Sequence, residues 1–168
     1  MSHEPPTDAD PRPLRRARAL ALEADRAERT LRRLYPALAR ALGPRDVARL
    51  GCEMIRSHPF SVGCGVDFAA LWPDFLAVGL QDDVRRGVWL WELARYEEAL
   101  AWAARGVDAP RLACEHRVDE LHAELLGGGA WQAPRPGRVV FAFERGRHGP
   151  RAALLRDFEA RTPLPRAC

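Results

Sequence analysis

LYPALARALG (residues 34–43), IRSHPF (55–60), DFAALWPDFL (67–76) and WLWELARYEEAL (89–100) are the four segments that decide the fold. In the last of them, Trp89, Leu93 and Leu100 recur at the spacing of one helix face. Prolines interrupt the other three segments. Proline suits the first turn of a helix and disfavours helix in the residue before it, so each proline marks a helix boundary. The segments predict a mainly α-helical protein, a bundle of five to six helices.

Three helices are expected before residue 58. The first runs from Leu14 to Leu34, and the second begins at Pro36 and is closed by Gly43. The third runs from Pro44 to Ser57 and ends at His58-Pro59, where the histidine caps the last carbonyls. The apolar residues of the first helix line one face, namely Leu20, Ala24, Ala27, Leu31 and Leu34.

The next helices are expected around the tryptophans. Asp67 can cap the entry to a helical segment, and Pro73 starts a further turn through Leu76. The strongest helix spans residues 82–105, and a final one runs from Pro110 to Leu126. Most of the tryptophans at this spacing are expected in the core, with Trp91 off the main stripe.

The two ends of the chain differ from this block. Residues 1–13 are proline-rich and acidic and predict a disordered lead-in, followed by a helical domain over residues 14–126. Residues 127–137 predict a linker, and residues 138–168 a small C-terminal strand-helix appendage. That appendage comprises a strand at 138–143, a turn at 146–150 and a helix at 151–160. A strand needs a pairing partner, either a weaker strand around Trp131 or one donated by another polypeptide.

The charge is unevenly distributed. The chain of 168 residues carries a net charge of +3, and all 26 of its basic residues are arginine. Residues 11–56 hold 12 arginines and five acids, whereas residues 67–100 hold three arginines and seven acids. This layout suits a charged protein partner at least as well as nucleic acid, and the acidic segment is a candidate docking face. An N-terminus without an apolar stretch and the absence of a long apolar run predict a cytoplasmic protein with no membrane contact.

Catalytic equipment is not evident in the sequence. Cys52, Cys64, Cys114 and Cys168 have no zinc-finger spacing, and none has a local base that would activate a nucleophile. His116 and His122 are six residues apart, which places them on different faces of the expected helix. We therefore predict no enzymatic activity, no catalytic residue, no metal site and no cofactor.

The ordered motifs resemble the N-terminal domain of the HvfC/BufC family, which is often labelled as DNA-binding. The resemblance covers roughly residues 30–108. It rests on a Tyr-Pro helix start, a His-Pro helix end, an aromatic-Pro element and a Leu-Ala-x-aromatic-Glu helix. They are found here at Tyr35-Pro36, His58-Pro59, residues 72–76 and residues 93–97. Ala69 and Trp72 depart from the usual Gly and Phe of the family.

The resemblance implies a non-catalytic role. Proteins of this kind, such as those of the MbnC and TglI type, bind iron-dependent oxidative enzymes of the MbnB/TglH type. They help to present a ribosomally made precursor peptide, in peptide-natural-product or copper-related peptide biosynthesis. We therefore expect this chain to form a heterodimer with such an enzyme and to bind its precursor peptide.

Two surfaces are candidates for these contacts. The enzyme is expected at Trp91, Glu92, Arg95 and Glu98. The peptide is expected at an open edge of the predicted strand, formed by Arg138, Val139, Val140, Phe141, Ala142 and Phe143. Neighbouring arginines would favour an acidic peptide. The alternative for this strand is a small internal sheet closed by local residues.

The alternative function is that of a DNA-associated regulatory protein. The arginines of the first helix favour it, whereas the interspersed acids Glu23, Asp25 and Glu28 are typical of a solvated face.

Overall fold

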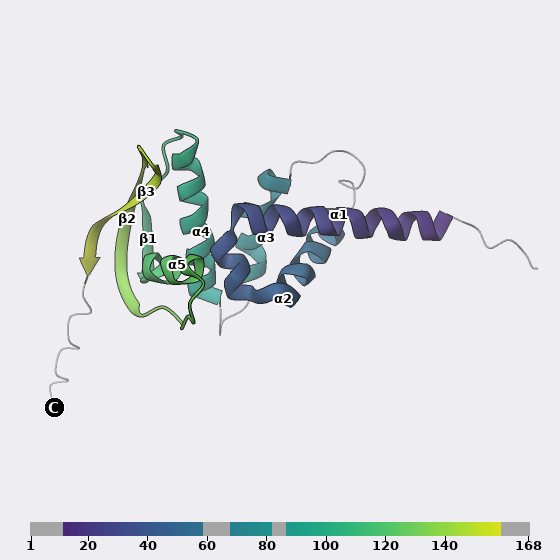
Figure 1. Ribbon diagram of the computed structural model, residues 1–168, viewed down its shortest axis with the longest axis horizontal. Helices are drawn as coiled ribbons and strands as arrows, with labels where there is room; N and C mark the ends of the chain where they lie inside the picture. The colour runs from purple at the N-terminus through teal and green to yellow at the C-terminus, as the bar shows by residue number, and fades with distance from the viewer. Residues whose placement is uncertain (1–11, 59–67, 82–86, 159–168) are drawn as a thin grey trace, which may run out of the picture.

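The computed structural model describes residues 12–58, 68–81 and 87–158. Helices α1–α3 form one end of the molecule, a three-stranded sheet with α5 forms the other, and α4 lies between them (Figure 1). This arrangement confirms the mainly helical class with a small C-terminal appendage. The helices are α1 (Arg12–Leu34), α2 (Pro36–Ser57), α3 (Phe68–Gln81), α4 (Gly87–Ala104) and α5 (Val118–Gly127), and the strands are β1 (Leu112–His116), β2 (Pro136–Gly146) and β3 (Gly149–Phe158).

Helix α1 packs through the predicted apolar stripe. Ala27 and Leu31 are fully buried, and Ala24 and Leu34 pack against the same core. Gly51 of α2 makes the crossing with α1 close, because a Cβ at this position would lie 3.0 Å from the carbonyl oxygen of Ala24. The two helices therefore meet backbone to backbone at this point.

The predicted boundaries around α2 are confirmed. Tyr35 is non-helical and Pro36 begins the helix. Gly43, with a φ of +78°, breaks the helical conformation within α2, and Pro44 starts its second segment. At the end, both the backbone N–H and the Nδ1 of His58 lie within hydrogen-bond distance of the Met54 carbonyl, at 3.1 and 3.0 Å.

Pro73 does not start a new turn, and this prediction is wrong. Helix α3 runs continuously from Phe68 through Pro73 to Gln81. Trp72 and Leu76, four residues apart, are 0% and 1% exposed, so burial of one helix face keeps the segment helical despite the backbone hydrogen bond that a proline cannot make. The expected cap at Asp67, the residue Pro59 and the start of the helix predicted from residue 82 lie outside the described residues.

The helix predicted from Pro110 to Leu126 is also wrong. Its first part is the strand β1, in which only Cys114 is buried, between half-buried Leu112 and His116. Its second part is α5, where Asp119 and Glu120 in the first turn favour helix and Gly128 closes the end with a φ of +76°. Pairing of β1 with β2 therefore overrides a local helical preference.

The C-terminal appendage contains a strand where a helix is predicted. The strand predicted at 138–143 is present within β2, but residues 151–158 continue as β3 rather than as a helix. The two strands pair antiparallel from Arg138–Phe158 to Gly146–Gly149 across the turn at Arg147-His148. The predicted pairing partner around Trp131 is wrong as well, since Trp131 packs against Trp89 with ring centroids 5.7 Å apart.

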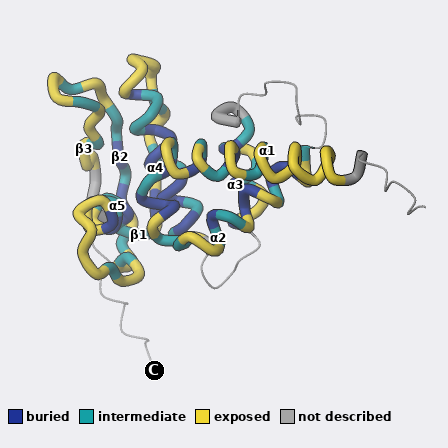
Figure 2. The backbone as a smooth tube through the Cα atoms, turned by 45° about the vertical axis from the view of Figure 1, so that its right-hand side comes forward, coloured by how far each residue is buried: buried dark blue, intermediate teal, exposed yellow. Residues whose placement is uncertain are grey.

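Helix α4 contributes residues to two hydrophobic clusters, one in the helical half of the molecule and one beneath the sheet. Leu90, Leu93 and Ala94 belong to the core of the helical half. Tyr96 belongs to a second cluster with Cys114, Val118, Val139 and Phe141, which lies between α4 and the sheet. Figure 2 shows α4 buried along much of its length, in contrast to the exposed outer half of α1. The sheet thus takes strands from both sides of the predicted linker and shares α4 with the bundle.

Among the described residues, the helices include none with the length and apolar character that crossing a membrane requires.

Candidate functional site

Helix α4 holds three buried carboxylates, those of Glu92, Glu97 and Glu98, which are 7%, 3% and 8% exposed. A buried carboxylate is costly unless hydrogen-bond donors or opposite charges surround it. Each of the three has such a partner, from α2 for Glu97, from β1 for Glu92 and from α4 itself for Glu98. Three of the seven acids in the segment expected as a docking face are therefore internal, whereas Asp74 is exposed and the other three lie outside the described residues.

Glu97 caps helix α2 from a distance of about sixty residues in sequence. Its Oε1 accepts a hydrogen bond from the Ala37 N–H at 2.8 Å, and its Oε2 accepts one from the Leu38 N–H at 2.9 Å. Tyr35, at the N-cap position, offers no side-chain cap. Glu97 thus satisfies two free donors of the helix end, and a negative charge there also complements the helix dipole. Two of the motif elements are thereby joined, because Glu97 of the Leu93–Glu97 element binds the two residues that follow Tyr35-Pro36.

Glu92 binds the end of strand β1. Its Oε1 accepts a hydrogen bond from the backbone N–H of Glu115 at 2.8 Å, and its Oε2 lies 3.0 Å from Nδ1 of His116. The carboxylate therefore occupies a backbone donor of a strand that lies at one edge of the sheet. A charged side chain in this position disfavours the addition of another strand at this end of β1.

Glu98 forms a partly exposed cluster with Arg95 and Trp91. The guanidinium of Arg95 donates to Glu98 at 2.6 Å and lies 5.5 Å from the centre of the Trp91 ring. Burial raises the pKa of Glu98, and Arg95 opposes that rise. A small hollow of about 70 Å³ adjoins the cluster and reaches Trp102 and Arg111.

The four residues predicted to contact the enzyme differ in exposure. Glu92 faces the sheet and Glu98 is buried beneath Arg95, whereas Trp91 and Arg95 are half-exposed. Two of the four residues thus reach the surface.

The predicted open edge at β2 is not available, and this expectation is corrected. β2 is the central strand, with β1 on one side and β3 on the other. Val139 and Phe141 pair with both neighbours and are buried. The alternative left open by the sequence, a sheet closed by local residues, is the one observed. Among the predicted peptide-binding residues, Arg138 is exposed and lies 3.5 Å from Glu115.

The open edge belongs instead to β3. Within the described residues β3 pairs with β2 alone. Pro150 has no N–H to give to a ladder, so its position is one whose backbone faces away from β2, and two-residue alternation places Ala152 in the same orientation. The register shifts between Val140 and Phe141, which leaves Leu155 as an extra residue in a bulge. Leu154 and Leu155 are 44% and 45% exposed.

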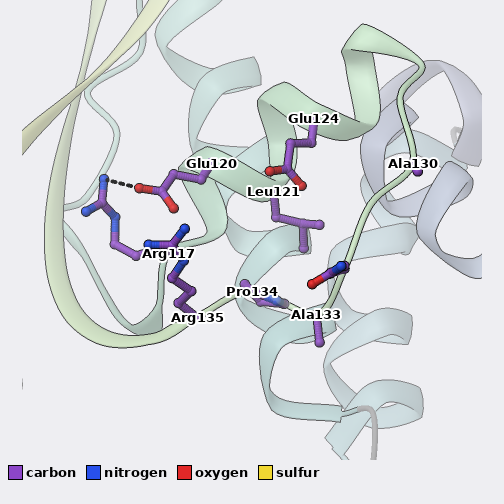
Figure 3. Close-up of a pocket in the computed structure, with 9 residues that line it drawn as sticks. Arg117, Glu120, Leu121, Glu124, Ala130, Ala133, Pro134 and Arg135 are labelled. Carbon is purple, nitrogen blue, oxygen red and sulfur yellow. Dashed lines mark ion pairs between the residues drawn. The ribbon is translucent and has the colours of Figure 1, made fainter.

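A larger hollow of about 240 Å³ lies between α5 and the segment before β2 (Figure 3). Arg117 forms part of its wall, but its guanidinium pairs with Asp119 at 3.0 Å and with Glu120 at 3.1 Å. Its backbone N–H donates to the carbonyl of Arg135 at 3.1 Å. The volume is below that of most small-molecule sites, and two of the four charged residues that line it, Arg117 and Glu120, pair with one another. We assign no ligand to it.

The cysteines and histidines do not assemble a reactive centre in the described part of the chain. Cys114 is buried, and burial together with nearby Glu92 raises the pKa of its thiol to about 12, so it is protonated at neutral pH. Cys52 is exposed, and Cys64 and Cys168 lie outside the described residues. The described residues contain no group of three or more His, Cys, Asp or Glu that could hold a metal ion.

Comparison of the chain with protein-family models, with curated proteins and with solved structures finds no match.

Proposed function

We propose that this chain is a non-catalytic accessory subunit that binds an iron-dependent oxidative enzyme and presents the ribosomal precursor peptide of that enzyme. The proposal combines the motif resemblance with one structural observation, the outer edge of β3, which pairs with no strand of the described part of the chain and lies beside two exposed leucines. An extended peptide can add to such an edge through backbone hydrogen bonds, while apolar contacts select its side chains.

The contacts that α4 makes with the sheet favour peptide binding at β3. Glu92 occupies the backbone N–H of Glu115 at the end of β1, which disfavours strand addition at that edge relative to β3. Behind the sheet, Tyr96 makes edge-to-face contacts with Phe141 and Phe143 at 5.2 and 5.4 Å, which fixes the sheet on α4. A peptide that binds at β3 therefore meets a preorganised surface and orders little of the protein on binding.

The enzyme contact is proposed at the half-exposed pair Trp91 and Arg95. Tryptophan and arginine are the residue types that most often dominate the energy of protein interfaces. The pair lies on the same helix that supports the sheet, so one helix would connect the two binding surfaces.

The test uses the full chain and the iron-dependent oxidase encoded nearest to its gene. Co-expression should give a 1:1 complex, and a labelled precursor peptide should bind with an anisotropy change. Ala152→Pro removes an outward N–H from β3 and should abolish peptide binding, whereas Ala152→Val, similar in size, keeps the N–H and should bind. A chain that stays monomeric and leaves the activity of the oxidase unchanged would overturn the proposal.

The second candidate function, DNA association, is favoured by the outer half of α1. Residues 14–22 are exposed on every side, and this part of α1 projects from the body (Figure 1). Within the described residues the side chains of Arg15, Arg16 and Arg18 form no ion pair. A labelled 20-base-pair duplex should then bind with a steep salt dependence that R15E/R16E/R18E removes. Absence of binding at low salt excludes this function.

A further inference from the structure

Four arginines gather where the β2–β3 turn meets the end of α4. Arg145, Arg147 and Arg151 come from the hairpin, and Arg105 follows the last residue of α4. A Cβ at Gly106 would lie 3.6 Å from Arg145, and one at Gly146 would lie 2.9 Å from Nε of Arg151. The side chains of Arg145 and Arg151 therefore lie across these two glycines. Figure 1 shows the end of α4 and the hairpin turn at the same end of the molecule. We call these four residues the basic tip.

The basic tip differs from the arginines of α1 and α2 that pair within their own helix, and it resembles Arg15, Arg16 and Arg18 of α1, which are also exposed and unpaired within the described residues. Arg29, Arg32 and Arg49 each pair with a carboxylate on their own helix, at 2.8 or 2.9 Å. In contrast, the four arginines of the tip are exposed and form no ion pair within the described residues. Glu144 and Asp108 lie close in sequence, and neither pairs with the tip. The tip thus presents positive charge that a ligand can neutralise.

The tip is continuous with the open edge of β3. Arg151 lies next to Ala152, whose N–H and C=O face outward, and Leu154 and Leu155 follow along the same strand. Strand residues rise by about 3.3 Å, so the distance from Arg151 to Leu155 is roughly 13 Å along the edge. Positive charge, outward backbone groups and exposed leucines therefore follow one another within a few residues.

This order of features favours a polypeptide over a nucleic acid. Phosphates would engage the arginines but would leave the outward backbone groups of β3 and the leucines without complementary partners. An extended peptide satisfies all three, because its backbone pairs with the edge and its side chains point to alternate faces.

From this arrangement we infer that the ligand of the β3 edge is an extended acidic–apolar peptide segment. Its Asp or Glu side chains lie at the basic tip, and its aliphatic side chains lie at Leu154 and Leu155. The inference rests on the proposed function and adds the chemistry of the peptide. Because the charge is confined to one end of the strand, it sets the register of the bound segment.

The test is a selection of random 12-residue peptides displayed on phage against the full-length chain. Peptides that bind the unmodified chain should be enriched in Asp and Glu towards one end and in aliphatic residues beside them. R147E/R151E should lose the acidic enrichment or reverse it to basic residues. R15E/R16E, which changes the net charge equally on exposed positions of α1, should keep it. Circular dichroism and thermal unfolding of each variant show that the fold is retained.

A direct measurement follows from the selected peptides. Replacing Asp and Glu by Asn and Gln in a labelled selected peptide should weaken binding to the unmodified chain at least tenfold at low salt. The same replacement should have little effect on binding to R147E/R151E.

Selected peptides that show no acidic bias but lose binding to Ala152→Pro would overturn this inference and leave the proposed function in place. Selected peptides that bind Ala152→Pro normally would overturn the proposed function. A 20-base-pair duplex that binds through Arg147 and Arg151, with no acidic bias among peptides, would show that the ligand class is wrong.

Discussion

At the scale of single residues, buried acids of α4 connect separate elements of the fold. The carboxylate of Glu97 joins α4 to α2, and that of Glu92 joins α4 to β1. The sequence could not predict either contact, because a Tyr-Pro helix start and a glutamate about sixty residues away show no local sign of touching. A signal was nevertheless present, since a helix start without a capping side chain at Tyr35 requires an acceptor from elsewhere.

The first prediction concerns this cap. Glu97→Ala should lower the free energy of unfolding by about 3 kcal/mol, because the N–H groups of Ala37 and Leu38 would be buried without an acceptor. Glu97→Gln keeps one acceptor oxygen and should cost roughly half as much. The exposed substitution Glu124→Gln, the control, should change stability by less than about 0.5 kcal/mol. Urea unfolding measures all three, and equal stability of Glu97→Ala and Glu124→Gln would contradict the role of Glu97.

The second prediction concerns alkaline pH. Burial raises the pKa of the Cys114 thiol and of the Tyr96 hydroxyl to about 12, above the ordinary values of 9.0 and 10.0. Above pH 9 the unfolded chain loses these protons and the folded chain keeps them, so stability is complete below the unfolded pKa and falls as pH rises towards 12. The melting temperature should therefore decrease between pH 8.5 and 11. Cys114→Ala and Tyr96→Phe should each flatten the decrease relative to their own values at pH 8, and unchanged slopes in both variants would contradict this assignment.

At the scale of elements, local pattern predicted the helices and missed two strands. Helices α1, α2 and α4 follow apolar periodicity and proline or glycine punctuation, which act within a few residues. Strand β1 has five residues, and its partner β2 begins twenty residues after it ends, beyond α5. In β3 the run Ala152-Ala153-Leu154-Leu155 is typical of a helix, and pairing with β2 overrides it. The predicted peptide site lies on the wrong strand for the same reason. The sequence predicts only β2, which is expected at an edge of the sheet, whereas the structure places β2 in the centre and β3 at the edge.

The third prediction compares two helical glycines. Gly51→Ala places a Cβ 3.0 Å from the Ala24 carbonyl, so it should destabilise the protein by about 1–3 kcal/mol through separation of α1 and α2. Gly79→Ala lies on an exposed part of α3 with no atom within 4 Å of the new Cβ, and should stabilise by about 0.5–1 kcal/mol. The two substitutions are chemically identical, so opposite signs in thermal unfolding report the close approach alone. The same sign for both would show that the α1–α2 crossing tolerates a methyl group.

At the scale of the whole molecule, the bundle and the sheet are expected to unfold together. Helix α4 contributes Leu93 to one core and Tyr96 to the other, and Arg40 of α2 donates to the carbonyls of Leu125 and Leu126 at the end of α5. The sequence predicted a separate appendage after a linker, yet β1 precedes that linker and pairs with β2 beyond it. Neither half therefore has a core of its own that α4 does not share.

The last prediction tests this coupling. Phe141→Ala, in the sheet, removes a ring that is 1% exposed and should lower the free energy of unfolding by about 3–5 kcal/mol. If α4 couples the halves, tryptophan fluorescence should shift to lower denaturant together with the far-ultraviolet circular dichroism. Four of the five tryptophans, Trp72, Trp89, Trp91 and Trp131, lie in or pack against the core of the bundle. A matched core substitution in the bundle, Leu38→Ala at 0% exposure, should also shift the unfolding midpoints of the two signals together.

If Phe141→Ala instead separated the signals into two transitions, with the tryptophan transition unchanged, the sheet would be an independent unit. A single transition would instead show that α4 unfolds as one unit with both halves, as expected if it connects the proposed peptide site at β3 with the proposed enzyme contact.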